Sequence, residues 1–119
     1  MQIAVIGAGN MGCLYGANLA RIGESVIMLD VWQEHVDRMQ KDGIQMDGLH
    51  GSFTGAVAAT TQLACAPKSD IALVCVNAYS TGEAATAAKV LLKDSGFALT
   101  LQNGLGNVEV LAEVLGKER

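Results

Sequence analysis

A run of closely spaced glycines near the amino terminus has the composition of a phosphate-binding turn. It directly follows the apolar stretch 1–6. Gly7 permits a sharp turn off a strand, Gly9 has no side chain to hold a pyrophosphate away from the backbone, and Gly12 lets a following helix lie close to the sheet. A helix that begins near Asn10 would direct its amide groups and its positive dipole end at the phosphates. The predicted cofactor-binding residues of this turn are Gly7, Ala8, Gly9, Asn10, Met11 and Gly12.

An acidic residue further along the chain supports a dinucleotide site. Asp30 follows the glycine run at close to the roughly 20-residue spacing typical of the acid that binds the adenosine ribose. Its carboxylate can accept hydrogen bonds from both ribose hydroxyls, whereas its charge would repel a 2′-phosphate. Asp30 therefore favours NAD over NADP. Two alternatives stay open: a glycine turn without a ligand, and an acid that only stabilises the amino end of the next helix.

Two asparagines follow later predicted strands. Ligands of open α/β sheets bind outside the carboxyl ends of the strands, and Asn77 and Asn103 come at such ends. Each amide can donate and accept a hydrogen bond, which suits a ribose hydroxyl, a nicotinamide amide or a substrate carbonyl. Asn103 precedes Gly104, so it also fits a plain turn. Tyr79 is a remote candidate for the general acid of this crevice, and no His, Lys or other Tyr is placed there.

The elements that must position these residues alternate between strand and helix. Apolar runs predict strands, periodic segments predict helices, and a glycine-bounded turn predicts a short hairpin. The predicted strands are 2–6, 25–29, 70–76 and 97–101, the hairpin strands are 44–47 and 52–57, and the helices begin near residue 10 and cover 32–41, 80–93 and 108–115. This order predicts an α/β fold with a Rossmann-like, doubly wound, mainly parallel sheet and a hairpin insertion, forming one dinucleotide-binding domain over residues 1–119.

Composition narrows the classes of partner. The 119 residues include eight basic and twelve acidic side chains, for a net charge of −4 without a basic cluster, which argues against nucleic acid or an anionic membrane surface. No apolar run has the length of a membrane span, and no signal peptide precedes the first strand, so we expect a cytoplasmic protein. Apolar residues make up 50% and charged residues 17% of the chain, which indicates surface that a further domain or a second subunit covers.

The three cysteines fit reduced thiols better than disulfides or metal ligands. Cys13, Cys65 and Cys75 are odd in number and lack metal-ligand spacing. We expect all three to be small buried apolar side chains. Cys13 stands near a helix amino terminus, a position that can lower the pKa of a thiol.

Three segments together resemble the amino-terminal domain of the ketopantoate reductases (2-dehydropantoate 2-reductases). They are GAGNMG, DIALVCVNAYST and LQNGLGNVEVL, and the similarity spans nearly the whole chain. The resemblance implies NADPH-dependent reduction of a 2-oxo acid by hydride transfer from the nicotinamide, as in the synthesis of pantoate for pantothenate. It implies cofactor contacts at Gly7, Gly9 and Gly12, and places Asn103 beside the nicotinamide and the substrate.

The chain departs from this family's pattern at two places. The family usually carries a lysine at the position of Asn77, and this lysine helps to bind cofactor or substrate. The resemblance therefore implies that the substrate carboxylate lacks a positively charged contact at Asn77. It commonly has an arginine for the 2′-phosphate after the second strand, where this chain has Asp30 and Val31. The resemblance thus implies NADP(H), while Asp30 and Val31 favour NAD(H).

The resemblance also implies a helical carboxyl-terminal domain, which supplies the catalytic lysine and an acidic substrate ligand and which we expect to be absent from this chain. The isolated domain should then bind the cofactor and turn over poorly. A non-catalytic nucleotide-binding redox sensor is the alternative function, because it would use the same turn and Asp30 without a general acid.

Overall fold

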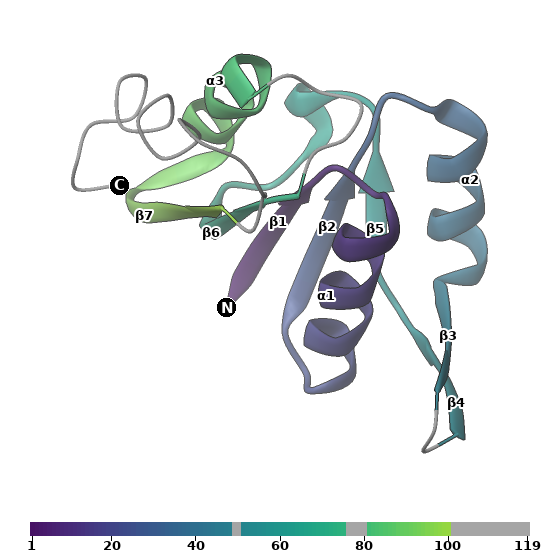
Figure 1. The fold of residues 1–119 in the computed structure, drawn as a ribbon. Helices are drawn as coiled ribbons and strands as arrows, with labels where there is room; N and C mark the ends of the chain where they lie inside the picture. Colours follow the sequence, from purple (N-terminus) through teal and green to yellow (C-terminus); the bar gives the residue numbers. More distant parts are fainter. Residues whose placement is uncertain (49–50, 76–80, 101–119) are drawn as a thin grey trace.

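A five-stranded parallel sheet forms the centre of the computed structural model, which describes residues 1–48, 51–75 and 81–100 (Figure 1). Its strand order is β5-β2-β1-β6-β7. The strands are β1 (Gln2–Ile6), β2 (Ser25–Leu29), β5 (Ala58–Thr60), β6 (Ser69–Val74) and β7 (Leu92–Thr100). The helices are α1 (Asn10–Arg21), α2 (Gln33–Asp42) and α3 (Thr81–Leu91), with a 3-10 turn η1 (Leu63–Cys65). A separate antiparallel pair joins β3 (Ile44–Gly48) to β4 (Gly51–Gly55).

Side-chain alternation along the central strand divides the interior into two cores. Ile3 and Val5 point to one face of β1, while Ala4 and Ile6 point to the other, as the period of two in a strand requires. The helices α1 and α2 and the hairpin cover the first face, and α3 covers the second (Figure 1). Both faces of the sheet are therefore covered at β1, β2 and β6, which confirms the predicted doubly wound α/β fold.

The order of the strands reverses at β1. The chain moves outward from β1 to β2 and β5, and then returns to place β6 on the other side of β1. Open α/β sheets bind ligands where the strand order reverses in this way. Backbone bonds extend the sheet past this point, since Gly7 N–H donates to the Leu29 carbonyl (2.8 Å) and Cys75 N–H donates to the Ile6 carbonyl (3.0 Å).

The predicted hairpin is present and packs against α1. Gly55 lies so close to this helix that a Cβ on it would stand 2.7 Å from the Cα of Ala17. Arg21 places its guanidinium 4.4 Å from the centre of the Phe53 ring, a cation–π contact between the helix and β4. The hairpin therefore adds to the cover of the core beneath α1.

Several boundaries differ from the sequence-based expectation. The second hairpin strand ends at Gly55 rather than residue 57, and the sequence analysis missed β5, which pairs with β2 at the sheet edge. An Ala-Ala-Thr strand is too short and too weakly apolar to produce a periodic signal. Helix α3 ends at Leu91 rather than residue 93, because the chain enters β7 immediately; the register shifts between the pairs Ser69–Leu92 and Ile71–Phe97.

Strand β7 begins at Leu92, five residues before the predicted start at residue 97, and the other predicted boundaries lie within two residues of those observed. Strands 2–6 and 25–29 and the start of α1 agree with the prediction, while α2 and β6 shift slightly, to Gln33–Asp42 and Ser69–Val74. The helix predicted over 108–115 and the end of the strand over 97–101 lie outside the described residues.

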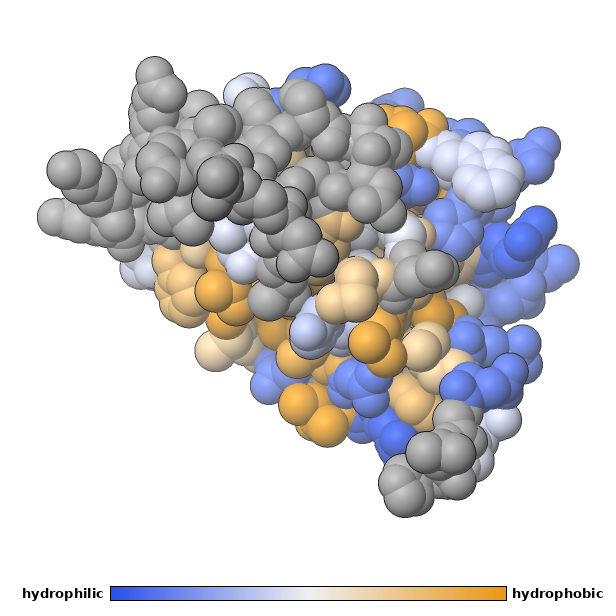
Figure 2. Space-filling view, viewed as in Figure 1, coloured by the Kyte–Doolittle hydropathy of each residue, from blue (hydrophilic) through white to orange (hydrophobic). Residues whose placement is uncertain are grey.

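The surface carries several large apolar side chains. Figure 2 shows orange groups beside β7 and along α1. The exposed large apolar residues are Met1, Met11, Leu14, Ile22, Val31, Trp32, Val90, Phe97 and Leu99. Among the helices of the described ranges, none combines the length and the apolar character that crossing a bilayer requires.

Candidate functional site

The glycine turn joins β1 to α1 with almost no space between strand and helix. Gly7 has φ 101°, in the left-handed region that favours glycine. A Cβ on Gly12 would lie 1.9 Å from the Gly7 carbonyl oxygen, so the first turn of α1 rests directly on the chain that leaves β1. These observations confirm the conformational requirements predicted for Gly7 and Gly12.

The same geometry leaves the amino end of α1 without a side-chain cap. Gly9 occupies the N-cap position and has no side-chain oxygen to offer the first amides, while α1 begins at Asn10 without an acid in its first turn. The first backbone bond of the helix runs from Cys13 N–H to the Gly9 carbonyl (2.9 Å). Amide groups of this kind can donate to the oxygens of a phosphate, and the helix dipole favours the negative charge.

Asp30 stands at the carboxyl end of β2, next to the turn. Its backbone N–H donates to the Thr60 carbonyl (3.4 Å), and the residue is only 8% exposed. It precedes α2 rather than belonging to it, because Trp32 is the N-cap and Glu34 is the acid of the first helical turn. Asp30 therefore lies between the end of β2 and the N-cap of α2.

A histidine that the sequence analysis did not single out ties α2 to the turn. His35 Nε2 lies 2.8 Å from the carbonyl oxygen of Ala8, and Cys13 Sγ donates to the same oxygen at 3.3 Å. Side chains of both α1 and α2 therefore contact Ala8, the second residue of the turn. A signal was present in the sequence, because Trp32, His35 and Val36 follow the i, i+3, i+4 spacing of one helix face.

The Cys13 thiol has a raised pKa, contrary to the effect expected of a helix amino terminus. Burial of the thiol is the main cause, and the nearby Asp30 carboxylate raises the pKa further. Burial also raises the pKa of the Cys75 thiol. The expectation that all three cysteines are buried is wrong for Cys65, which is exposed on η1, and Cys13 is half-buried.

An open groove of about 550 Å³ lies beside the turn. It runs between α1, α2 and β3. Its lining residues are Met11, Cys13, Leu14, His35, Arg38, Met39, Gly43, Ile44, Gln45 and Met46. Of the predicted cofactor residues Met11 is part of this lining, whereas Asp30 and the first three residues of the turn are not. Neither Gly7 nor Asp30 therefore lines the groove.

The described residues bring together one half of the predicted site. The turn over residues 7–12 and Asp30 lie at adjoining strand ends, linked by the bond from Gly7 N–H to the Leu29 carbonyl (2.8 Å). Asn77, Tyr79 and Asn103 lie outside the described residues. The structure therefore brings the predicted phosphate-binding turn next to the predicted ribose-binding acid.

Comparison with known proteins gives the family. The sequence matches the family described as Ketopantoate reductase PanE/ApbA over residues 3–119. The chain belongs to the ketopantoate reductase family. Among curated relatives, the 2-dehydropantoate 2-reductase of Halobacterium salinarum is 39% identical over 118 residues, which cover 95% of this chain and 37% of the relative. The chain thus spans less than two fifths of that relative's length.

Solved structures of this family share the fold. A PanE/ApbA family ketopantoate reductase from Ralstonia eutropha JMP134 superimposes with a TM-score of 0.85 and 33% identity, covering 98% of this chain and 39% of that one. The ternary structure of a D-mandelate dehydrogenase with NADH and anilino(oxo)acetate gives a TM-score of 0.83 and 25% identity, covering 96% and 37%. The sheet and helices described above therefore recur in about two fifths of each of these solved chains.

Proposed function

We propose that this chain is the dinucleotide-binding part of an NAD(H)-dependent reductase that converts a 2-oxo acid, such as ketopantoate, into its 2-hydroxy acid. One observation carries the proposal: the turn over residues 7–12 and the Asp30 carboxylate stand at adjoining strand ends where the strand order reverses. Membership of the ketopantoate reductase family supports the class of reaction.

The turn fits a nicotinamide dinucleotide in shape and charge. Gly9 provides backbone without a side chain where a pyrophosphate would approach, and the first amides of α1 would donate to its oxygens. Asp30 would accept hydrogen bonds from the two hydroxyls of the adenosine ribose. Once bound, the nicotinamide supplies the hydride for the keto carbon.

The choice of NAD(H) over NADP(H) rests on Asp30 and Val31. The Asp30 carboxylate would repel a 2′-phosphate, and Val31 beside it is an exposed apolar residue without positive charge. A relative of similar fold, the D-mandelate dehydrogenase, was solved with NADH. This likeness supports the preference, although the family resemblance by itself favours NADPH.

Asn77 and Asn103 are the proposed contacts at the nicotinamide and substrate end. Their amides can donate to a carbonyl and accept from a hydroxyl, but they do not supply a general acid. We therefore propose that reduction also requires the lysine of a helical carboxyl-terminal domain or second subunit, as the resemblance implies. The cytoplasmic location expected from the free thiols likewise stays a prediction.

Calorimetric titration of the purified chain with NADH and NADPH tests the proposal. We expect NADH to bind more tightly. The Asp30→Ala variant should lose about 10- to 100-fold in NADH affinity, since hydrogen bonds to a charged group contribute about 1.5 to 3 kcal/mol. Asp37→Ala is the matched control, because Asp37 is an exposed acid on α2 that accepts a bond from Gln33.

Each outcome of this titration bears on a separate part of the proposal. Absence of heat with both cofactors near millimolar concentration would refute dinucleotide binding. Tighter binding of NADPH, or an equal loss in both variants, would leave the dinucleotide site in place and overturn the role given to Asp30.

A further inference from the structure

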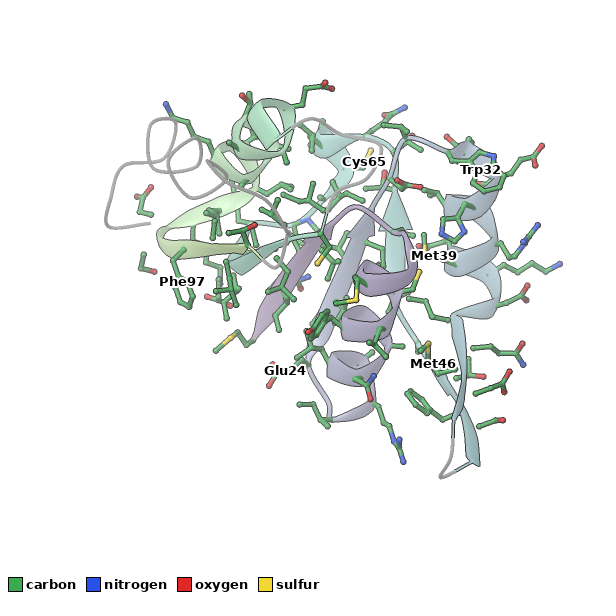
Figure 3. All side chains as sticks on the ribbon, in the orientation of Figure 1. Glu24, Trp32, Met39, Met46, Cys65 and Phe97 are labelled. Atoms are coloured by element: carbon green, nitrogen blue, oxygen red, sulfur yellow. The ribbon has the colours of Figure 1, made fainter. Side chains whose placement is uncertain are left out.

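The single tryptophan of the chain is exposed at the amino end of α2, close in sequence to Asp30. Trp32 comes two positions after Asp30 and is 58% exposed. Figure 3 shows it at the amino end of α2, on the side of the sheet where β1 and β2 end. An indole in this position presents a flat apolar surface beside the place proposed for the ribose.

The indole is held in a defined position relative to the glycine turn. Its ring centroid lies 5.7 Å from that of His35, with the two planes inclined by 34°. His35 Nε2 in turn lies 2.8 Å from the Ala8 carbonyl oxygen. This chain of contacts links Trp32 to the backbone at which a pyrophosphate would bind, so the surface for a flat ligand is largely preformed.

We propose that Trp32 stacks on the adenine of the bound dinucleotide. The inference rests on the proposed function, because an adenosine ribose on Asp30 places its adenine one glycosidic bond away, beside the residues that follow β2. Aromatic side chains stack on bases without regard to the hydrogen-bonding pattern of the base. Trp32 would therefore add affinity at the adenine end, while Asp30 decides between the two dinucleotides.

Intrinsic fluorescence offers a direct test because all tryptophan emission from the chain comes from Trp32. The probes are ADP-ribose, which carries the adenine without nicotinamide, and nicotinamide mononucleotide, which lacks the adenine. Adenine absorbs at shorter wavelengths than tryptophan emits, so quenching by ADP-ribose requires contact rather than energy transfer. We expect ADP-ribose to quench the emission and nicotinamide mononucleotide to leave it unchanged.

Calorimetry with ADP-ribose on variants of the same chain measures the contribution of the stack. Trp32→Leu keeps an apolar side chain without a π-face and should weaken binding about tenfold, whereas Trp32→Phe should retain most of the affinity. The matched control is Phe97→Leu. Phe97 is also an exposed aromatic residue, but it pairs with Ile71, and through it with Ile3, toward the amino ends of the strands.

The outcomes separate this inference from the proposed function. ADP-ribose that binds without quenching Trp32, or that binds Trp32→Leu as tightly as the unmutated chain, would overturn the stacking and leave the dinucleotide site intact. A chain that binds neither ADP-ribose nor NADH would overturn the proposed function itself. If Trp32→Leu failed to fold, the quenching of the unmutated chain and the affinity of Trp32→Phe would still decide.

Discussion

The two faces of the sheet are packed by opposite means. On one face, α1 approaches the sheet because side chains are missing: Gly12 rests on Gly7, and a Cβ on Gly16 would lie 2.5 Å from the Met28 sulfur. On the other face, α3 packs through small side chains, and Ala84 and Ala88 are fully buried. On the first face, the missing side chains let the amino end of α1 pack directly on the backbone that leaves β1. On the second face, the small side chains of α3 only fill the space above the sheet.

This difference shows why tolerance to substitution should vary between the faces. A methyl group added between Gly12 and Gly7 meets a backbone carbonyl, which cannot rotate away. A methyl group removed from Ala88 leaves a small cavity that neighbouring side chains can partly fill. The face that carries the proposed phosphate turn is therefore the less adaptable one.

The largest effect is expected from Gly12→Ala. The new Cβ would lie 1.9 Å from the Gly7 carbonyl oxygen, so α1 must move away from β1. We expect a loss of about 3 kcal/mol in the free energy of unfolding, at the upper end for overpacked sites, measured by urea titration. NADH binding by calorimetry should also be lost.

Gly23→Ala provides the control for this change at the other end of α1. Gly23 has φ 100°, and no atom lies within 4 Å of the position that a new methyl group would take, so the substitution adds backbone strain without a clash. It should cost about 1 kcal/mol and leave NADH affinity unchanged. A loss of stability in Gly12→Ala no greater than in Gly23→Ala would contradict the close packing of the turn.

Ala88→Gly probes the α3 face and should have an intermediate effect. Glycine costs about 1 kcal/mol in helix propensity, and the lost methyl adds about 0.8 kcal/mol, for a total of about 2 kcal/mol. NADH affinity, followed by calorimetry, should be unchanged because α3 packs on the face of the sheet opposite to α1. If Gly12→Ala were more stable than Ala88→Gly, the α1 face of the sheet would not be the less adaptable one.

The smallest effect is expected at Asp70, which links β1 to the β6–β7 pair. The pKa of the Asp70 carboxyl is lowered, mainly by the hydrogen bond that it accepts from the Gln2 backbone N–H. Lys93 Nζ, 3.2 Å away, lowers this pKa further. A lowered pKa in the folded state stabilises the protein above the ordinary value of 3.8 and loses this effect as the pH falls through the folded-state pKa.

Asp70→Asn should therefore be slightly less stable than the unmutated chain at pH 7 and equally stable near pH 2. Urea titrations at several pH values would measure the difference, with Asp37→Asn on the exposed side of α2 as the control. A difference between Asp70→Asn and the unmutated chain that persists at low pH would show that the effect is not electrostatic.

Local patterns were sufficient for the elements whose residues signal them directly. The strands at 2–6 and 25–29 are apolar runs bounded by polar or glycine residues, and Gly7 and Gly12 could be interpreted from their spacing. Strand β5 forms by pairing with β2. The chain passes directly from α3 into β7, so β7 begins several residues before its predicted start. Neither change has a periodic signal within its own segment.

The order of residues was enough to predict the α/β class, the glycine turn between β1 and α1 and the place of Asp30 at the end of β2, because glycine spacing and short apolar runs act through the local backbone. Three other properties emerged only in the folded chain: His35 reaches the Ala8 carbonyl, Cys13 has a raised pKa, and Cys65 is exposed. These properties depend on which helix faces which turn. That relation is set by packing across the sheet, between residues far apart in the chain.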